Sequence, residues 1–130
     1  MSYSIYVQGF RDEDPCGLPE DAFLQIFGPY SILDESGFGS VVLPNGETAK
    51  IYSHRNDQEW TGFILSRFRR DVLDLVAKFM VETQAMTFLP EGIALNTQES
   101  KRADLPKDLQ ERAVVVRTGQ DVAEAIEHAT

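Results

Sequence analysis

The side chains best suited to chemistry in this chain are one thiol and two imidazoles, at Cys16, His54 and His128. Nucleophilic catalysis would need the thiol beside an imidazole, with a thiol pKa lowered toward neutrality. Cys16 instead follows an acidic run over residues 12–14, whose charge raises a thiol pKa. The two histidines stand 74 residues apart, which matches no metal-ligand spacing. We expect no catalytic residue, no metal site and no cofactor.

A glycine-rich stretch, Gly37-Phe38-Gly39-Ser40, has some likeness to a phosphate-binding loop. A Walker-type loop needs a lysine and a following helix, and the dinucleotide fingerprint needs a third glycine in a βαβ unit. The stretch meets the requirements of neither motif. We interpret the stretch as a turn that allows two backbones to approach closely.

Three arginines, Arg67, Arg69 and Arg70, stand at the start of a predicted helix, where the helix dipole favours anions over cations. They indicate an anion-binding site, or pairing with the acid-rich N-terminal segment, or an exposed rim. If they bind an anion, the alternative function is a small-ligand-binding protein or small enzyme. Its pocket would lie near the cluster and add His54, Tyr6 and Tyr52.

Acidic residues are concentrated near the N-terminus of a chain of net charge −9. Residues 1–48 carry eight acids and one base, residues 49–117 are nearly neutral, and the remainder adds three acids. This distribution argues against nucleic acid or an anionic membrane as the partner of the N-terminal part, and it favours either a basic protein partner or simple solubility. Trp60, in a polar segment over 54–62, is typical of an interface anchor, although a lone tryptophan is more often core. The predicted partner-binding residues are Asp12, Glu13, Asp14, Glu20, Asp21 and Trp60.

These residues must be positioned by strands and helices that alternate along the chain. Apolar side chains recur with a period of two or in short runs in the predicted strands, and Asn45-Gly46 indicates a hairpin with a type I′ turn. Residues 63–65 are either a strand or a run into the next helix. The predicted strands are 3–10, 30–34, 38–43, 48–53, 86–89 and 114–116.

Helix signals occupy the segments between these strands. Residues 69–83 have apolar side chains at three- and four-residue spacing, and Thr118 with Asp121 forms a capping box. Residues 11–18 and 90–105 are expected to be loop or irregular. The other predicted helices run from Pro19 to Gly28-Pro29 and, as a short turn, over 106–112. The fold class is therefore α+β, a mainly antiparallel sheet of five to six strands with two main helices and one short helix.

With 130 residues, 42% of them hydrophobic, the chain is expected to form a single globular domain over 1–130. Charge interrupts every long apolar stretch, so we expect neither a membrane span nor a signal peptide. A lone cysteine is typical of a reducing compartment. We expect a bacterial cytoplasmic protein.

The two ends of the chain carry a family resemblance, through Ser2-Tyr3-Ser4-Ile5-Tyr6-Val7-Gln8-Gly9-Phe10 and through residues 102–106 and 114–119. They resemble a group of small uncharacterised bacterial proteins, some of which look like immunity partners of secreted toxins. The resemblance implies a non-enzymatic protein that neutralises a toxin by occluding its active site. An acidic surface would speed association with such a basic partner, and a homodimer is compatible with either function.

Overall fold

A nine-stranded sheet dominates the structure, a computed structural model that describes residues 3–56 and 59–130. Its strands lie in the order β3-β4-β5-β6-β1-β7-β8-β9, with β2 paired to the end of β1. All pairs are antiparallel except β8 with β9. The strands are β1 (Ser4–Arg11), β2 (Asp14–Cys16), β3 (Ser31–Leu33), β4 (Phe38–Val42), β5 (Thr48–Asn56), β6 (Glu59–Ser66), β7 (Met86–Phe88), β8 (Ala94–Asn96) and β9 (Val114–Val115).

The predicted α+β class with a mainly antiparallel sheet is confirmed, but five to six strands is too few. Two of the additional strands, β2 and β8, have three residues each and lie in segments expected to be loop or irregular. So short a strand shows no measurable period and forms because a neighbour offers its backbone groups. The polar segment 54–62 was expected to be a loop, yet it contains the ends of β5 and β6; residues 57–58 lie outside the described part.

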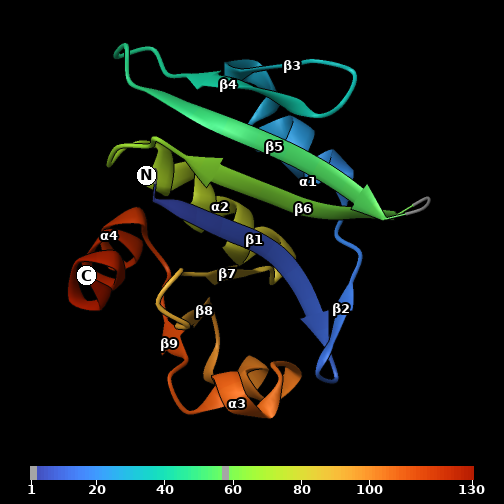
Figure 1. Ribbon diagram of the computed structural model, residues 1–130, viewed down its shortest axis with the longest axis vertical. Helices are drawn as coiled ribbons and strands as arrows, with labels where there is room; N and C mark the ends of the chain where they lie inside the picture. Colours follow the sequence, from blue (N-terminus) through green and yellow to red (C-terminus); the bar gives the residue numbers. More distant parts are fainter. Residues whose placement is uncertain (1–2, 57–58) are drawn as a thin grey trace.

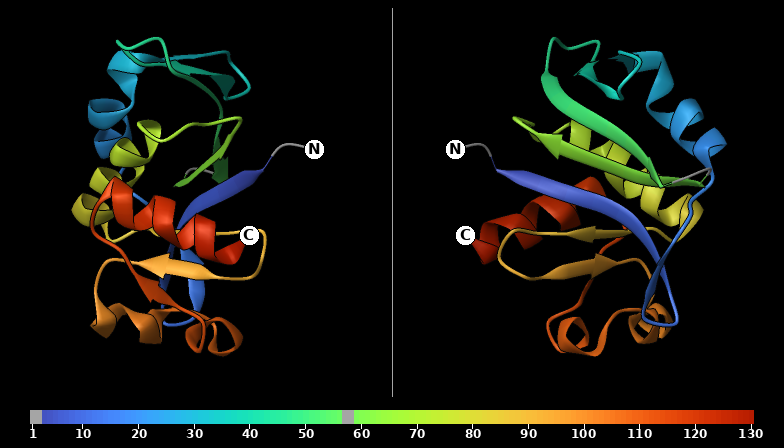
Figure 2. Two further views of the ribbon diagram at one scale, coloured as in Figure 1. Left: turned by 90° about the vertical axis from the view of Figure 1, so that its left-hand side faces the viewer. Right: turned by 45° about the vertical axis from the view of Figure 1, so that its right-hand side comes forward.

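Helices cover one face of the sheet and leave much of the other open. Figure 1 shows α1 and α2 behind the central strands, and the turned views of Figure 2 keep both on that side, while α4 lies beside the left-hand ends of the strands in Figure 1. Thr118 and Asp121 form the predicted capping box at the start of α4. The helical elements are α1 (Glu20–Ile26), η1 (Gly28–Tyr30), α2 (Val72–Thr83), η2 (Glu99–Asp104), α3 (Lys107–Gln110) and α4 (Gly119–Ala129).

The main core fills the space between the sheet and these helices. Alternate residues of the central strands, among them Val7 and Phe63, point toward the helices and are fully buried. Four phenylalanines and Trp60 pack ring against ring at its centre, with Phe63 in contact with the other four rings. The sheet therefore has one face buried in a continuous aromatic and aliphatic core.

A smaller apolar cluster lies at the β7–β8 end of the opposite face. Met86 and Ala94 project from the sheet there and are buried beneath Leu105 and Ala113, which belong to the segment containing η2 and α3. This segment closes only the lower end of the second face in the view of Figure 1. The face remains open over β4, β5, β6 and β1.

Two hairpin turns differ from the sequence-based prediction. In the β4–β5 hairpin only Gly46 has positive φ (89°), and Leu43 N–H donates to Glu47 at 2.9 Å, so the turn is not type I′. Pro44 sets the φ of a first turn position and makes a three-residue loop closed by glycine the favoured form. The β1–β2 turn instead has positive φ at both Asp12 (50°) and Glu13 (72°), the type I′ pattern.

Candidate functional site

A single row of large side chains crosses the open face of the sheet from strand to strand. Phe38 pairs with Tyr52, Tyr52 with Ile64, Ile64 with Tyr6, and Tyr6 with Phe88. Because paired residues in a sheet project to the same side, these five side chains form one continuous line across five strands. We call this line the open-face row.

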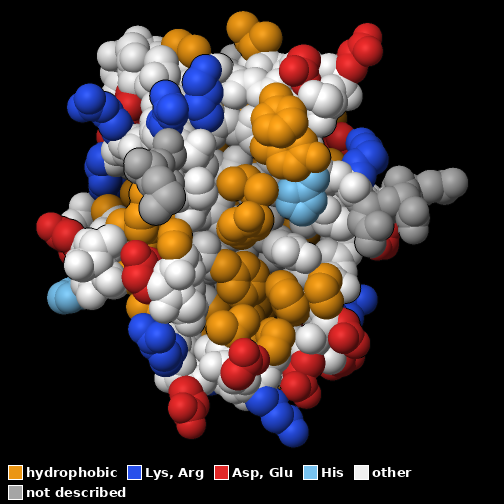
Figure 3. Space-filling model, in the orientation of Figure 1, with side chains coloured by type: hydrophobic (Ala, Val, Ile, Leu, Met, Phe, Trp, Pro, Cys, Tyr) orange, Lys and Arg blue, Asp and Glu red, His pale blue; other side chains and the backbone are white. Residues whose placement is uncertain are grey.

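The open-face row is exposed where soluble proteins usually place polar residues. Phe38 is 57% exposed and Tyr6 49%, and the rings of Phe38 and Tyr52 stack with centroids 4.3 Å apart. Figure 3 shows the hydrophobic side chains as a continuous stripe down this face. A contiguous apolar patch of this kind is typical of an interaction surface.

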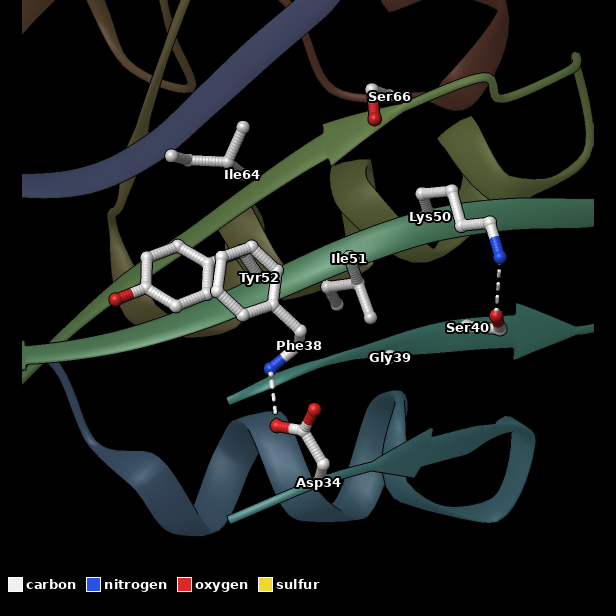
Figure 4. A pocket seen from close by; sticks show the side chains of 9 residues that line it. All are labelled: Asp34, Phe38, Gly39, Ser40, Lys50, Ile51, Tyr52, Ile64 and Ser66. Carbon is white, nitrogen blue, oxygen red and sulfur yellow. Dashed lines mark hydrogen bonds between the residues drawn. The ribbon is translucent and has the colours of Figure 1, made fainter. Parts of the chain in front are cut away.

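Polar residues, three serines and a lysine, flank the open-face row on one side. Ser40, Lys50, Ser66 and Ser4 are paired in register and form a second line, the polar row. The step between large and small side chains leaves a hollow of about 610 Å³. Figure 4 shows Tyr52 beside this hollow and the Lys50 ammonium donating to the Ser40 hydroxyl, at 3.2 Å.

His54 borders the open-face row on its other side. Its ring stacks on that of Tyr52 with centroids 5.9 Å apart, and its Nδ1 lies 2.6 Å from the Thr61 hydroxyl. That hydroxyl also lies 3.1 Å from the His54 carbonyl oxygen, so Thr61 holds the imidazole against β6. Burial lowers the pKa of His54 below its ordinary value of 6.5.

This lowered pKa predicts an acid-dependent loss of stability. The folded state binds the His54 proton less readily than the unfolded state, so the stabilisation is complete above pH 6.5 and is lost as the pH falls toward the folded pKa. Urea unfolding of the His54→Gln protein should show a weaker pH dependence in this window. The matched control is His128→Gln, on the exposed end of α4, which should keep the wild-type dependence. Equal slopes in both variants would contradict the prediction.

The predicted acidic binding residues are divided between two places. Asp12, Glu13 and Asp14 are exposed at the β1–β2 turn, where the Asp12 N–H donates to the Asp104 carboxylate and the Glu13 N–H to its carbonyl. Glu20 and Asp21 lie in the first turn of α1, on the helix-covered side, and Glu20 is paired with Arg55. The first group therefore borders the open face (Figure 1), whereas Glu20 reaches only its margin, where it shares a hollow with Asp34 and His54.

Further carboxylates join the β1–β2 turn at this end of the strands. Asp34 and Glu35 follow β3, and Glu59 begins β6, all of them exposed. Hydrogen bonds from the Ser36 hydroxyl and from backbone N–H groups keep the pKa of Asp34 below its ordinary value. We call this end of the open face the acidic end; it comprises Asp12, Glu13, Asp14, Asp34, Glu35 and Glu59.

The prediction that Trp60 anchors a partner does not fit its position. Its side chain is 4% exposed and lies against Phe23 and Phe79, and its indole N–H donates to the Ser53 hydroxyl at 2.8 Å. Strict alternation from Phe63 would place Trp60 on the open face, but the register shift opposite His54 and Arg55, beside Gly62 with its φ of 140°, turns Trp60 toward the helices. It is a core residue whose polar atom is satisfied internally.

The arginine cluster is separated by the fold, and the anion at the helix start comes from the chain itself. The Glu47 carboxylate accepts from the Val72 N–H at 2.9 Å, at the N-terminus of α2. Arg70 donates to Asp74 at 2.8 Å, whereas Arg69 is exposed beside the β4–β5 turn. The arginines and His54 lie too far apart to line one pocket as predicted. Ser66, the residue before Arg67, pairs with Lys50, and Lys50 lies four residues, about 13 Å, from His54 along β5.

The thiol and the imidazole of the hypothetical nucleophilic pair line different hollows. Burial, chiefly, together with the carboxylates of Glu59 and Asp104, raises the pKa of Cys16, against the opposing effect of Arg11. Within residues 3–56 and 59–130, no cluster of three or more histidine, cysteine or acidic side chains is placed to hold a metal ion.

The glycines at 37 and 39 lie where backbones meet, as the sequence indicates. A Cβ on Gly37 would lie 2.2 Å from the Ser53 carbonyl oxygen, which leaves room for no side chain. Of the open-face row itself, only Tyr6 and Tyr52 were selected from the sequence, and as handles of a pocket. Alternation within β1 was the available signal for Tyr6, since Ile5 and Val7 point the other way.

Comparison with known protein families, curated proteins and solved structures finds no match for this chain. In the described part of the chain there is no helix with the length and hydrophobicity needed to cross a bilayer.

Proposed function

We propose that this chain is a non-enzymatic, cytoplasmic protein-binding module of the immunity or inhibitor type, which binds a basic protein partner on the open face of its sheet. The observation that carries the proposal is the open-face row, five aligned large side chains of which only Phe88, at one end, packs against the smaller apolar cluster. Protein interfaces have such a composition at their centre, rich in aromatic side chains and poor in charge.

The acidic end supplies the charged rim of this interface. Its residues at the β1–β2 turn stand on a tight two-residue turn that Asp104 holds by two hydrogen bonds. A preordered acidic turn loses little conformational entropy when a basic surface docks on it. The negative charge concentrated at this rim also speeds the encounter with a cationic partner such as a nuclease-type active site.

The proposal is tested by capture from the source cell's lysate and secreted fraction with the tagged protein, at low and high salt. The double variant Tyr6→Thr with Tyr52→Thr keeps strand-favouring residues and removes two rings of the open-face row. It should lower the affinity for the captured partner at least about tenfold. The matched control is Val81→Thr on α2, 45% exposed against 49% for Tyr6, which should leave the affinity unchanged.

A second variant tests the charged rim without disturbing the turn. Replacing Asp12 by asparagine and Glu13 by glycine removes two carboxylates and introduces the pair that type I′ turns favour. Association with the partner should slow severalfold at low salt, and the difference should vanish at high salt. A partner retained equally by every variant would contradict the proposal.

Small-ligand binding is a second candidate function, favoured by the hollow between the open-face row and the polar row. Tyr52 and Ile64 form an apolar side, and Lys50 offers an ammonium group at its margin. A flat aromatic carboxylate has the matching chemistry. Such a compound should raise the melting temperature of the wild-type protein and not that of Lys50→Ala; no shift in either protein would exclude this class of ligand.

A further inference from the structure

Charge on the open face is separated along the direction of the strands. Within the polar row and beyond it, where β5 begins and β6 ends, lie the cations of Lys50, Arg67 and Arg69, which we call the basic end. At the other end of the same strands, the six carboxylates of the acidic end outnumber two arginines, one of which is paired with Glu20. Figure 3 shows lysine and arginine gathered at the upper left and acids at the upper and lower right.

This separation makes the face complementary to itself. When two copies stack face to face about a two-fold axis that runs along the open-face row, the strands of one copy run reversed over those of the other. The basic end of each copy then lies over the acidic end of its counterpart, so the attraction occurs twice. Stacked sheets lie about 10 Å apart with strands within about 30° of alignment, a spacing at which large side chains interdigitate.

We propose that the open face binds a second copy of this chain when no partner is present, forming a two-fold symmetric dimer. The row of one copy covers the row of the other, which removes Phe38 and Tyr6 from water. The ammonium of Lys50 and the guanidinium of Arg69 take the place that the proposed function gives to the partner's basic groups. The dimer therefore masks the partner-binding surface, and its dissociation exposes that surface.

The masking of the partner-binding surface rests on the proposed function. The dimer itself does not, because self-association is measured on the purified chain alone. Sedimentation equilibrium over a concentration series should show a reversible monomer–dimer equilibrium that weakens as salt is added. The Tyr6→Thr, Tyr52→Thr variant should raise the dimer dissociation constant at least about tenfold. Val81→Thr on α2 should leave it unchanged.

The tyrosine substitutions also separate face stacking from strand addition. Edge-to-edge pairing joins backbone groups of β3, the last strand at one edge of the sheet, so Tyr6→Thr with Tyr52→Thr should spare such a dimer. Face-stacked dimers should be weakened by the same variant.

Charge reversal tests the predicted orientation. One variant carries Lys50→Glu with Arg69→Glu, so that both ends are acidic, and another carries Asp14→Lys with Glu35→Lys, which makes the acidic end more basic. Each should self-associate severalfold more weakly than wild type, and an equimolar mixture should form a heterodimer at low salt, because each reversed end meets its complement. A monomer at every concentration, a dimer unaffected by the tyrosine substitutions, or a mixture without heterodimer would each overturn the inference. None of these results bears on capture of a basic partner.

Discussion

Replacing Phe63 by alanine should lower the free energy of unfolding by about 3–5 kcal/mol, a large part of the total stability of a domain of this size. Phe63 is fully buried and its ring contacts those of Phe23, Phe27, Trp60 and Phe79. Truncation removes the apolar area and leaves a cavity that four large rings cannot close without leaving their own contacts.

The measurement is urea unfolding followed by the fluorescence of Trp60, the single tryptophan of the chain and a neighbour of the cavity. The same substitution at Phe38 is the matched control, because that ring is 57% exposed on the open face. Phe38→Ala should change the unfolding free energy by about 1 kcal/mol or less. Similar losses in the two variants would show that the sheet face opposite the helices is also a core.

A methyl group at position 62 should destabilise the protein by about 3 kcal/mol or more, or prevent its accumulation in soluble form. Gly62 has a φ of 140°, and a Cβ there would lie 2.0 Å from the Val7 carbonyl oxygen on β1. The neighbouring atoms are backbone, so β1 and β6 would have to separate at the centre of the sheet.

Gly46→Ala is the control for the backbone strain alone. Gly46 also has positive φ, 89°, but a Cβ there meets nothing within 4 Å. Its loss should be limited to about 1–2 kcal/mol, the cost of a left-handed conformation for alanine. Thermal and urea unfolding of the two variants compare these costs directly, and an equally mild effect of Gly62→Ala would mean that β1 yields more easily than the sheet pairing implies.

Predictions based on local sequence patterns agreed well with the structure. Alternation assigned Ile5 and Val7 to the buried face of β1 and Tyr6 to the other, and three- and four-residue spacing located α2. The capping box at Thr118 and the hairpin around Gly46 were likewise predicted. Each of these features depends on residues within about one or two turns of helix or one hairpin.

Features that depend on pairing between distant segments did not follow from the sequence. β2 and β8 are strands because β1 and β7 offer hydrogen-bonding partners, and Trp60 is core because β6 directs it toward α1 and α2. The anion at the start of α2 is the carboxylate of Glu47, which accepts from the N–H of Val72, 25 residues away along the chain. No short stretch of the sequence contains both partners of such a contact.

The candidate site shows the same division. The sequence by itself determined that Tyr6 lies on the face of β1 opposite the core, since side chains alternate along any strand. Only the tertiary structure decided that Tyr6 stands in line with Ile64 and with Phe88, 82 residues away. Register between strands is set by the packing of the whole buried face, and a shift of one residue would move every side chain to the other side. The open-face row, and with it the proposed interface, therefore exists only in the folded sheet.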